Sequence, residues 1–311
     1  MESSAKRIRL ATRESRLALR QTEMVAETLR KQHPGLAVEL VGMTTRGDQV
    51  LDRPLAQVGG KGLFVKELEA ALDDGRADLA VHSMKDVPMQ LEPRFTLATF
   101  GARENPLDAF CSVRHASLAA LPAGAVVGTS SLRRECQLRH RYPGLDLRAL
   151  RGNVNTRLAK LDAGDYDAII LAAAGLRRLG FEARIRATID DAIPAIGQGI
   201  LGVEYLRGRD DVAALVAPLA HAATACAARA ERALGLVVEG SCEVPVGAIA
   251  RVEGEHLTLE AFIGLPDGSR IVRDKASGAC AQAEAIGQAL GEKLLAQGGR
   301  EILRQLSQVR A

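Results

Sequence analysis

The sequence predicts an α/β protein, with two α/β lobes around a cleft and a small α+β domain at its C-terminal end. Three observations predict this fold class. At 311 residues the chain is too long for one ordinary core. Short apolar runs alternate with helix-period segments as far as residue 206. After residue 218, three strand-like runs cluster ahead of two helical segments, which favours a separate α+β domain with a three-stranded sheet.

The first lobe begins with short strands separated by amphipathic helices. Leu17, Met24, Val25 and Leu29 recur at helical spacing, so residues 15–32 are predicted to form a helix with one buried side. Residues 63–72 repeat this pattern, and residues 46–62 are expected to be a loop because three glycines fall near their end. The predicted strands of this lobe are 7–12, 37–44, 78–82 and 95–100.

The second lobe repeats the alternation of strands and helices. The chain is expected to cross between the lobes at residues 101–106 and again at 196–199, which makes a hinge with a cleft. The expected domains are 1–101 plus 198–217, 102–197, and 218–311. The remaining predicted strands are 109–113, 125–128, 145–149, 166–172, one ending near 206, 246–252, 257–263 and 269–275; the helices are 131–141, 153–163, 174–179, 221–234, 280–297 and 301–309.

Arginine is concentrated in the second lobe. Between Gly128 and Arg157 there is no lysine, and only Glu135 and Asp146 offset the cations. Two cations 4 Å apart near a surface repel by about 4 kcal/mol, so a fold that gathers them needs an anion there. The guanidinium fork suits carboxylates and phosphates, which predicts a multiply anionic partner. The seven arginines are Arg133, Arg134, Arg139, Arg141, Arg148, Arg151 and Arg157.

The overall composition argues against a nucleic-acid partner. The net charge is only +3, aromatic residues make up 3% and Trp is absent, so neither a polycationic surface nor base stacking is supported. The first residues have no apolar signal core, and the seven-residue apolar run 168–174 is too short to span a bilayer. Five widely spaced cysteines without zinc-ligand spacing favour a reduced, cytoplasmic setting with no membrane contact.

Three predicted strand-to-helix junctions carry anion-binding side chains. They are Thr12–Ser15, Thr129–Arg134, and Arg151–Asn153 with Arg157 one turn later. N-capping explains Ser15, Ser131 or Asn153 when each is considered alone. An arginine in a first helical turn opposes the helix dipole, however, so arginines at several junctions favour an anion site.

Two further segments have side chains suited to chemistry. Asp86 follows Lys85 where a predicted strand leaves its sheet, and it either forms an Asx-turn or stabilises a developing cation. His82 is interpreted as a satisfied, partly buried histidine. Cys242 lies in a loop of small residues, where a thiol can be an inert side chain, a nucleophile or an attachment point.

Together these segments closely resemble the porphobilinogen deaminase (hydroxymethylbilane synthase) family. The resemblance extends from about Arg7 into the C-terminal domain, in the expected order and spacing. The matching runs are Ala11–Ser15, Thr45–Asp48, Val58–Phe64, Ala80–Pro88, Gly128–Arg134, Leu150–Asn153, Gly197–Gly199 and Gly240–Pro245.

The resemblance implies a fold, a cofactor and a reaction. The two lobes are expected to have the type II periplasmic-binding-protein fold, and the enzyme, a transferase, to act as a monomer. A dipyrromethane cofactor, made from substrate, is expected to be held by a thioether on Cys242. Four porphobilinogen molecules are then joined head to tail with loss of ammonia, and water releases hydroxymethylbilane, a step of tetrapyrrole and heme biosynthesis.

The resemblance also implies roles for individual residues. Asp86, with Lys85, is expected to stabilise the cationic methylene-pyrrolenine that forms as ammonia leaves, while Lys61 and Phe64 border a lid. The expected ligands of the substrate are Arg13, Ser15, Arg151, Arg157 and Arg178. The expected ligands of the cofactor are Arg13, Ser15, Lys85, Asp86, Thr129, Ser130, Ser131, Arg133, Arg134, Arg151, Gly152, Arg157 and Gln198.

The residues leave two other classes of function to weigh. A non-catalytic, two-lobed anion-binding module explains the arginines and the hinge, but it gives no use for Cys242 or for the third domain. An RNA-binding protein explains the arginines alone. Gln57 and Arg20 depart from the family pattern without touching its core motifs, which leaves only the charge of the lid uncertain.

Overall fold

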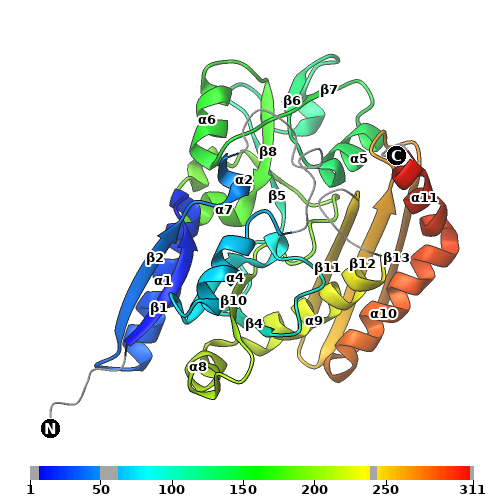
Figure 1. The fold of residues 1–311 in the computed structure, drawn as a ribbon. Helices are drawn as coiled ribbons and strands as arrows, with labels where there is room; N and C mark the ends of the chain where they lie inside the picture. Colours follow the sequence, from blue (N-terminus) through cyan, green and yellow to red (C-terminus); the bar gives the residue numbers. More distant parts are fainter. Residues whose placement is uncertain (1–6, 50–61, 239–243, 309–311) are drawn as a thin grey trace, which may run out of the picture.

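The computed structural model describes residues 7–49, 62–238 and 244–308. Within these ranges the strands form two five-stranded sheets and one three-stranded sheet (Figure 1). No helix in the described part of the chain is long and apolar enough to cross a membrane.

The sheet of the first lobe has the strand order β2-β1-β3-β10-β4. Strand β1 pairs in parallel with β2 and β3, while β10 runs antiparallel to β3 and β4. Ile8 and Leu10 are buried against Val25 and Leu29 of helix α1 (Arg16–Gln32), as the apolar spacing predicts. The strands are β1 Arg7–Arg13, β2 Ala37–Met43, β3 Leu79–Ser83, β4 Phe95–Phe100 and β10 Leu201–Leu206.

The second lobe has the corresponding order, β7-β6-β8-β5-β9. In both sheets the antiparallel inner strand is the one that arrives from the other lobe, β5 after the first crossing and β10 after the second. This is the strand order of the type II periplasmic-binding fold, so the predicted fold class is confirmed. The strands are β5 Asp108–Cys111, β6 Val126–Gly128, β7 Asp146–Arg148, β8 Ala168–Ala172 and β9 Ala187–Ile189.

The C-terminal part is an antiparallel three-stranded sheet covered by helices. Helices α9 (Ala222–Val237) and α10 (Ala283–Leu294) pack on each other and on the sheet, and α11 (Arg300–Gln308) follows (Figure 1). Their shared core includes Val238 and Val244, the described residues on either side of 239–243, together with Ile196 of the second crossing. The strands are β11 Val246–Glu253, β12 His256–Gly264 and β13 Ile271–Ala279.

A buried carboxylate joins both crossings to this third part. Glu231 of α9 has 0% exposure and accepts from Arg103 Nη1 of the first crossing at 2.5 Å. It also accepts from the backbone N–H groups of Gly197 (2.7 Å), in the second crossing, and Ala250 (2.8 Å), in β11. The segment before residues 239–243 is therefore anchored where the lobes connect.

The helix predicted to begin at residue 63 begins at Lys66, and the one predicted over 280–297 is α10 between a 3-10 turn and a π segment. Four further elements differ from the sequence-based expectation. A four-residue helix, α2 (Arg46–Gln49), begins the stretch predicted to be a loop. Strand β9 and helix α8 (Asp210–Val216) were not predicted, since three and seven residues are too few to show periodicity. Strand β13 ends at Ala279, beyond the predicted residue 275, because it stays paired with β12 as far as His256.

Candidate functional site

Most of the predicted site residues that the structure describes lie at the carboxyl ends of four strands, β1 and β3 in the first lobe and β6 and β7 in the second. Arg13 ends β1, and Lys85 with Asp86 forms the short 3-10 helix Met84–Asp86 directly after β3. In the second lobe, residues 129–131 join β6 to helix α5 (Leu132–Arg141), and residues 149–153 join β7 to α6 (Val154–Asp162). In open α/β sheets, ligands bind at these strand ends.

On the first lobe, Arg13 is held by a carboxylate and an aromatic ring. Its Nε donates to Asp48 Oδ2 at 3.0 Å, and Nη2 makes a second bond to the same carboxylate. The hydroxyl of Thr45 donates to Asp48 at 2.7 Å, and the Phe64 ring centre lies 4.1 Å from Arg13 Cζ. Burial alone raises the pKa of Asp48, but the bonds from Arg13 and Thr45 outweigh it and hold the pKa below its usual value.

Asp86 faces the remaining edge of the same guanidinium. Arg13 Nη1 lies 3.9 Å from Asp86 Oδ2, at the limit of an ion pair. Both side chains line a small pocket at the cleft, into which Asp86 presents a half-buried carboxylate. The other lining residues are Ser15, Leu17, Ala18, Gln21, Phe64, Val81, His82 and Ser83.

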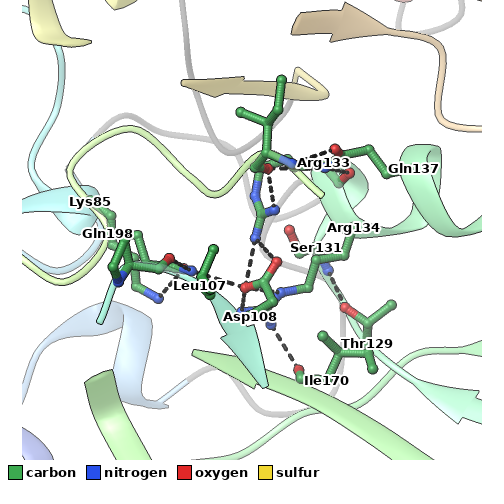
Figure 2. A network of polar contacts seen from close by, with 12 residues as sticks. Lys85, Leu107, Asp108, Thr129, Ser131, Arg133, Arg134, Gln137, Ile170 and Gln198 are labelled. Carbon is green, nitrogen blue, oxygen red and sulfur yellow. Dashed lines mark hydrogen bonds and ion pairs between the residues drawn. The ribbon is translucent and has the colours of Figure 1, made fainter. Parts of the chain in front are cut away.

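On the second lobe, Arg133 and Arg134 share one buried carboxylate (Figure 2). Asp108, which is 2% exposed, lies 2.8 Å from Arg133 Nη2 and 2.7 Å from Arg134 Nη2. The two guanidiniums also donate to the carbonyls of Ile193 and Ile170, each at 2.8 Å. Burial alone raises the pKa of Asp108, but both guanidiniums oppose this and keep the pKa far below the usual range.

Gln198 connects this cluster to the first lobe (Figure 2). Its Nε2 donates to Asp108 at 3.0 Å, and its Oε1 accepts from Lys85 Nζ at 3.2 Å. Burial lowers the pKa of Lys85 to about 8, although the charges of Asp86 and Asp108 partly offset this. Lys85 is therefore a cation at neutral pH that titrates more easily than an ordinary lysine.

Two more predicted arginines, Arg157 and Arg178, lie around the cleft. Arg157 donates from Nε to the carbonyl of Gly152 at 2.8 Å, and burial together with Arg134 and Arg151 lowers its pKa to about 10. Arg178 donates from Nη2 to the carbonyl of Gly199 at 2.8 Å, and burial lowers its pKa to about 10 as well. Cations exceed carboxylates here, which indicates a site for an anion.

The hydroxyl groups at these junctions have different partners. Ser15 caps α1, because its Oγ accepts from Ala18 N, so its capping interpretation is confirmed. Ser131 makes no such cap on α5, and its backbone N–H is bonded to Thr129 Oγ1 at 3.2 Å. Ser130 fixes the two loops of this lobe together, since its hydroxyl donates to the Leu150 carbonyl and accepts from the Leu150 N–H.

Gly152 is required by its backbone geometry. Its φ is +109°, and a Cβ there would lie 2.8 Å from side-chain atoms of Thr156. A side chain at this position would push apart the turn that links Arg151 to the first turn of α6. Gly152 therefore belongs to the site through the loop shape that it permits.

Fit to an oligopyrrole carboxylate can be tested on the donors that protein atoms leave unused. Within the described residues, the Nε atoms of Arg133 and Arg178 are buried and have no hydrogen-bond partner. Buried donors are normally satisfied, so these indicate a partner that protein atoms do not supply. An excess of guanidinium groups with unused donors fits a ligand with several carboxylates.

Three of the four described cysteines are poor nucleophiles. Burial raises the pKa of Cys111 and of Cys136 to about 12, and that of Cys226 to about 11. Cys280 is half-buried, and all four thiols are free. Cys242, Lys61 and Gln57 lie outside the described residues, so their predicted roles have no structural test; Arg20 is exposed and pairs with Glu27 at 3.2 Å.

Two acidic residues of the site were not predicted. Asp48 lies in Thr45–Asp48, a run that carries the family resemblance but was given no role, and Asp108 starts a strand with no motif of its own. Their partners are 35 and 25 residues away, so local spacing does not reveal the pairs. His82 is buried and bonded to Glu204 at 3.0 Å, which confirms it as a satisfied histidine.

Comparison with known proteins agrees with these features. The family model "Porphobilinogen deaminase, dipyromethane cofactor binding domain" matches residues 8–214, and "Porphobilinogen deaminase, C-terminal domain" matches residues 225–296. Among solved structures, the aliphatic sulphonate binding protein SsuA from Escherichia coli aligns with 77% of this chain and 73% of its own, at 14% identity and a TM-score of 0.42.

Curated relatives match nearly the full length. Porphobilinogen deaminase of Thiobacillus denitrificans is 58% identical over 96% of this chain and 98% of its own. The porphobilinogen deaminase of Bordetella parapertussis is 56% identical over 98% of each chain, and that of Burkholderia thailandensis is 59% identical over 96% of this chain and 92% of its own. The chain therefore belongs to the porphobilinogen deaminase family.

Proposed function

We propose that this protein is a hydroxymethylbilane synthase, a transferase that joins four porphobilinogen molecules head to tail with loss of ammonia. One observation supports this most strongly: cations from both lobes converge on a cleft in which Asp86 is a half-buried carboxylate. Porphobilinogen has an acetate and a propionate on a pyrrole ring. The cations of the cleft can form ion pairs with these carboxylates, and the Asp86 carboxylate can stabilise the positive charge that develops on the ring.

The proposed roles follow the geometry of the two lobes. Arg13 contacts a substrate carboxylate beside Asp86, while Asp48 holds its Nε edge. Asp86 stabilises the cationic methylene-pyrrolenine that forms when the amino nitrogen of the aminomethyl group leaves as ammonia, and it is placed to accept a hydrogen bond from a pyrrole N–H. Arg151, Arg157 and Arg178 complete the substrate ligands, with Ser15 at the start of α1.

We propose that dipyrromethane is the cofactor and that Cys242 holds it through a thioether. The attached cofactor supplies the terminal pyrrole carbon to which the first substrate is joined. Two observations support the attachment: three of the four described thiols have raised pKa values, and Val238 and Val244 pack beside Ile196, two residues before Gln198. The ligands proposed for its carboxylates are Arg13, Ser15, Lys85, Thr129, Ser130, Ser131, Arg133, Arg134, Arg151, Arg157 and Gln198, with Asp86 beside its pyrrole nitrogens and Gly152 shaping the loop.

The proposed domains divide this work. Residues 1–101 with 198–217 supply Asp86, residues 102–197 supply most arginines, and residues 218–311 supply the attachment cysteine. Lys61 and Phe64 are proposed to border a lid. We also propose a cytoplasmic monomer, as family membership and free cysteines favour; size-exclusion chromatography at the mass of one chain supports the monomer, and a dimer contradicts it.

A non-catalytic anion-binding module is the alternative function. It accounts for the cations of both lobes, but not for a carboxylate placed opposite Arg13 in the same pocket. Such a module also has no use for a covalent adduct. The two functions therefore predict different intact masses for the purified chain, and this difference can be measured directly.

The test is the intact mass of the protein purified from a host that makes porphobilinogen, with an aldehyde colour reaction for pyrroles. We expect wild type to carry a two-pyrrole adduct that disappears in Cys242→Ser. Cys280→Ser is the matched control, because Cys280 is half-buried in the same domain, and it should keep the adduct. A folded wild-type chain without any adduct would favour the anion-binding module.

A further inference from the structure

Asp108 occupies a position where charges from both lobes meet. It lies on β5, the first strand after the crossing into the second lobe, and it is 2% exposed. Its carboxylate bonds to Arg133 and Arg134 of α5, and also to Gln198 of the second crossing (Figure 2). Three elements far apart in sequence therefore share one carboxylate.

The geometry of these bonds fixes more than the charge. Arg134 uses both Nε and Nη2 on Asp108 Oδ1, at 3.0 and 2.7 Å, which sets the plane of its guanidinium. Arg133 reaches the same carboxylate through Nη2 only, so its Nε stays unbonded among the described residues. The two guanidiniums are adjacent in sequence and repel each other, so without Asp108 they would separate.

Gln198 extends the arrangement to the first lobe. The Gln198 amide has a definite orientation, because Nε2 has two acceptors, Asp108 and the Pro106 carbonyl at 2.7 Å. Its Oε1 consequently faces Lys85 Nζ. The carboxylate of Asp108 thus determines which way the amide presents its oxygen to the catalytic segment.

We infer that Asp108 is a positioning residue, which orients Arg133 and Arg134 for the carboxylates of the bound oligopyrrole and, through Gln198, holds Lys85 beside them. This inference rests on the proposed function for the identity of the anion. It adds a residue that touches neither cofactor nor substrate. One buried aspartate organises anion-binding cations that belong to different lobes.

The electrostatics around Lys85 give this role a signature that a purely structural role lacks. The charged groups that act on Lys85 are Asp86 and Asp108, which raise its pKa, and Arg134 and Arg133, which lower it. Removing the charge of Asp108 leaves Asp86 as the one named carboxylate that opposes the two arginines. The Lys85 ammonium then becomes less stable, and its pKa falls further.

The experiment compares Asp108→Asn, the double variant Asp108→Asn with Arg133→Gln, and wild type. We expect Asp108→Asn to lower the fraction of chains that carry the covalent adduct by roughly tenfold to hundredfold, as measured by intact mass. NMR of protein with 13C-labelled lysine, with every chain also carrying Cys242→Ser so that none is loaded, should show Lys85 titrating at lower pH with Asp108→Asn than without it. The double variant, which restores the charge balance, should return that titration toward wild type and load no worse than Asp108→Asn.

Asp146→Asn is the matched control, since Asp146 is a partly exposed aspartate of the same lobe that pairs with Arg148. It should change neither loading nor the Lys85 titration. If Asp108→Asn fails to fold while the double variant folds, charge balance is the cause and the inference holds. The inference is overturned if the Lys85 titration does not shift, if the losses of loading add up in the double variant, or if neither variant folds. A wild-type protein without adduct would contradict the proposed function, but the Lys85 titration would still test the inference.

Discussion

The two sides of the cleft use arginine and aspartate in opposite proportions. On the first lobe one guanidinium, that of Arg13, lies between two carboxylates, Asp48 and Asp86. On the second lobe one carboxylate, that of Asp108, lies between two guanidiniums, Arg133 and Arg134. The same two residue types therefore leave a spare negative charge on one side and a spare positive charge on the other.

This difference separates two tasks that a deaminase must perform at once. At an effective dielectric of 20, a unit charge 4 Å away contributes about 4 kcal/mol, so the local sign decides what each side stabilises. The first lobe suits the cation that forms when ammonia leaves. The second lobe suits the carboxylates of a growing chain, and Arg157 adds to its positive charge.

The largest expected effect is on the first lobe. Asp86→Asn removes the carboxylate that faces the reacting ring while keeping its shape. We expect turnover to fall by about 10²–10³-fold, the usual cost of losing one group that stabilises transition-state charge. The measurement is the rate of hydroxymethylbilane release by loaded protein.

Asp74→Asn provides the comparison variant for this prediction. Asp74 lies on the same lobe but is exposed and pairs with Arg76 at 3.3 Å. It should turn over at the wild-type rate. Wild-type turnover by Asp86→Asn would remove the catalytic assignment and with it the contrast between the two sides.

A second, smaller effect concerns the pH response of Lys85, which lies between the two sides. Without adduct, as in Cys242→Ser, Lys85 should titrate near its pKa of about 8. The ammonium form predominates below that pH, so affinity for carboxylates should fall as pH rises through it. Bound carboxylates stabilise the ammonium, so in loaded wild type the titration should move to higher pH.

Lysine-selective 13C NMR measures both titrations, and Lys85→Gln assigns the signal. Equal titration in loaded and unloaded protein would mean that no carboxylate approaches Lys85. That result would restrict the anion site to the second lobe alone.

The smallest effect tests how Arg13 is held. A Cβ on Gly47 would lie 2.3 Å from the Phe64 ring, so Gly47→Ala must move the ring away from the Arg13 guanidinium. Loss of this cation–π contact should raise KM by about two- to fivefold. Phe64→Leu, which removes the ring without the clash, should do the same, and an unchanged KM in both would show that the ring does not position Arg13.

Much of the fold followed from periodicity in the sequence. The helix with Val25 and Leu29 on its buried side forms as expected, and β4 spans the predicted residues 95–100. Leu17 and Met24, predicted on the same side, are only partly buried, and Leu17 lines the pocket. Elements without a period, such as the three-residue β9, were missed. The place where each strand ends, and so the place of the site, could be predicted because ligands bind at the carboxyl ends of strands.

The pairing of charges within the site could not be predicted. The sequence indicated a wall of arginines, but not that Arg133 and Arg134 would both be buried against Asp108. Which carboxylate a guanidinium meets depends on how β5 is inserted beside β8, and that is a consequence of the whole topology. The role of Asp48 could not be predicted for the same reason, because its pairing with Arg13 depends on where α2 lies relative to the end of β1.

The most direct test measures the intact mass of two variants before and after porphobilinogen is added. They are Asp86→Asn and the double variant Arg133→Gln with Arg134→Gln. A division of tasks between the sides predicts that Asp86→Asn carries the two-pyrrole adduct and barely gains mass. The arginine variant, folded by circular dichroism, should lack the adduct altogether. Normal loading of the arginine variant, or loss of the adduct from both, would contradict the division.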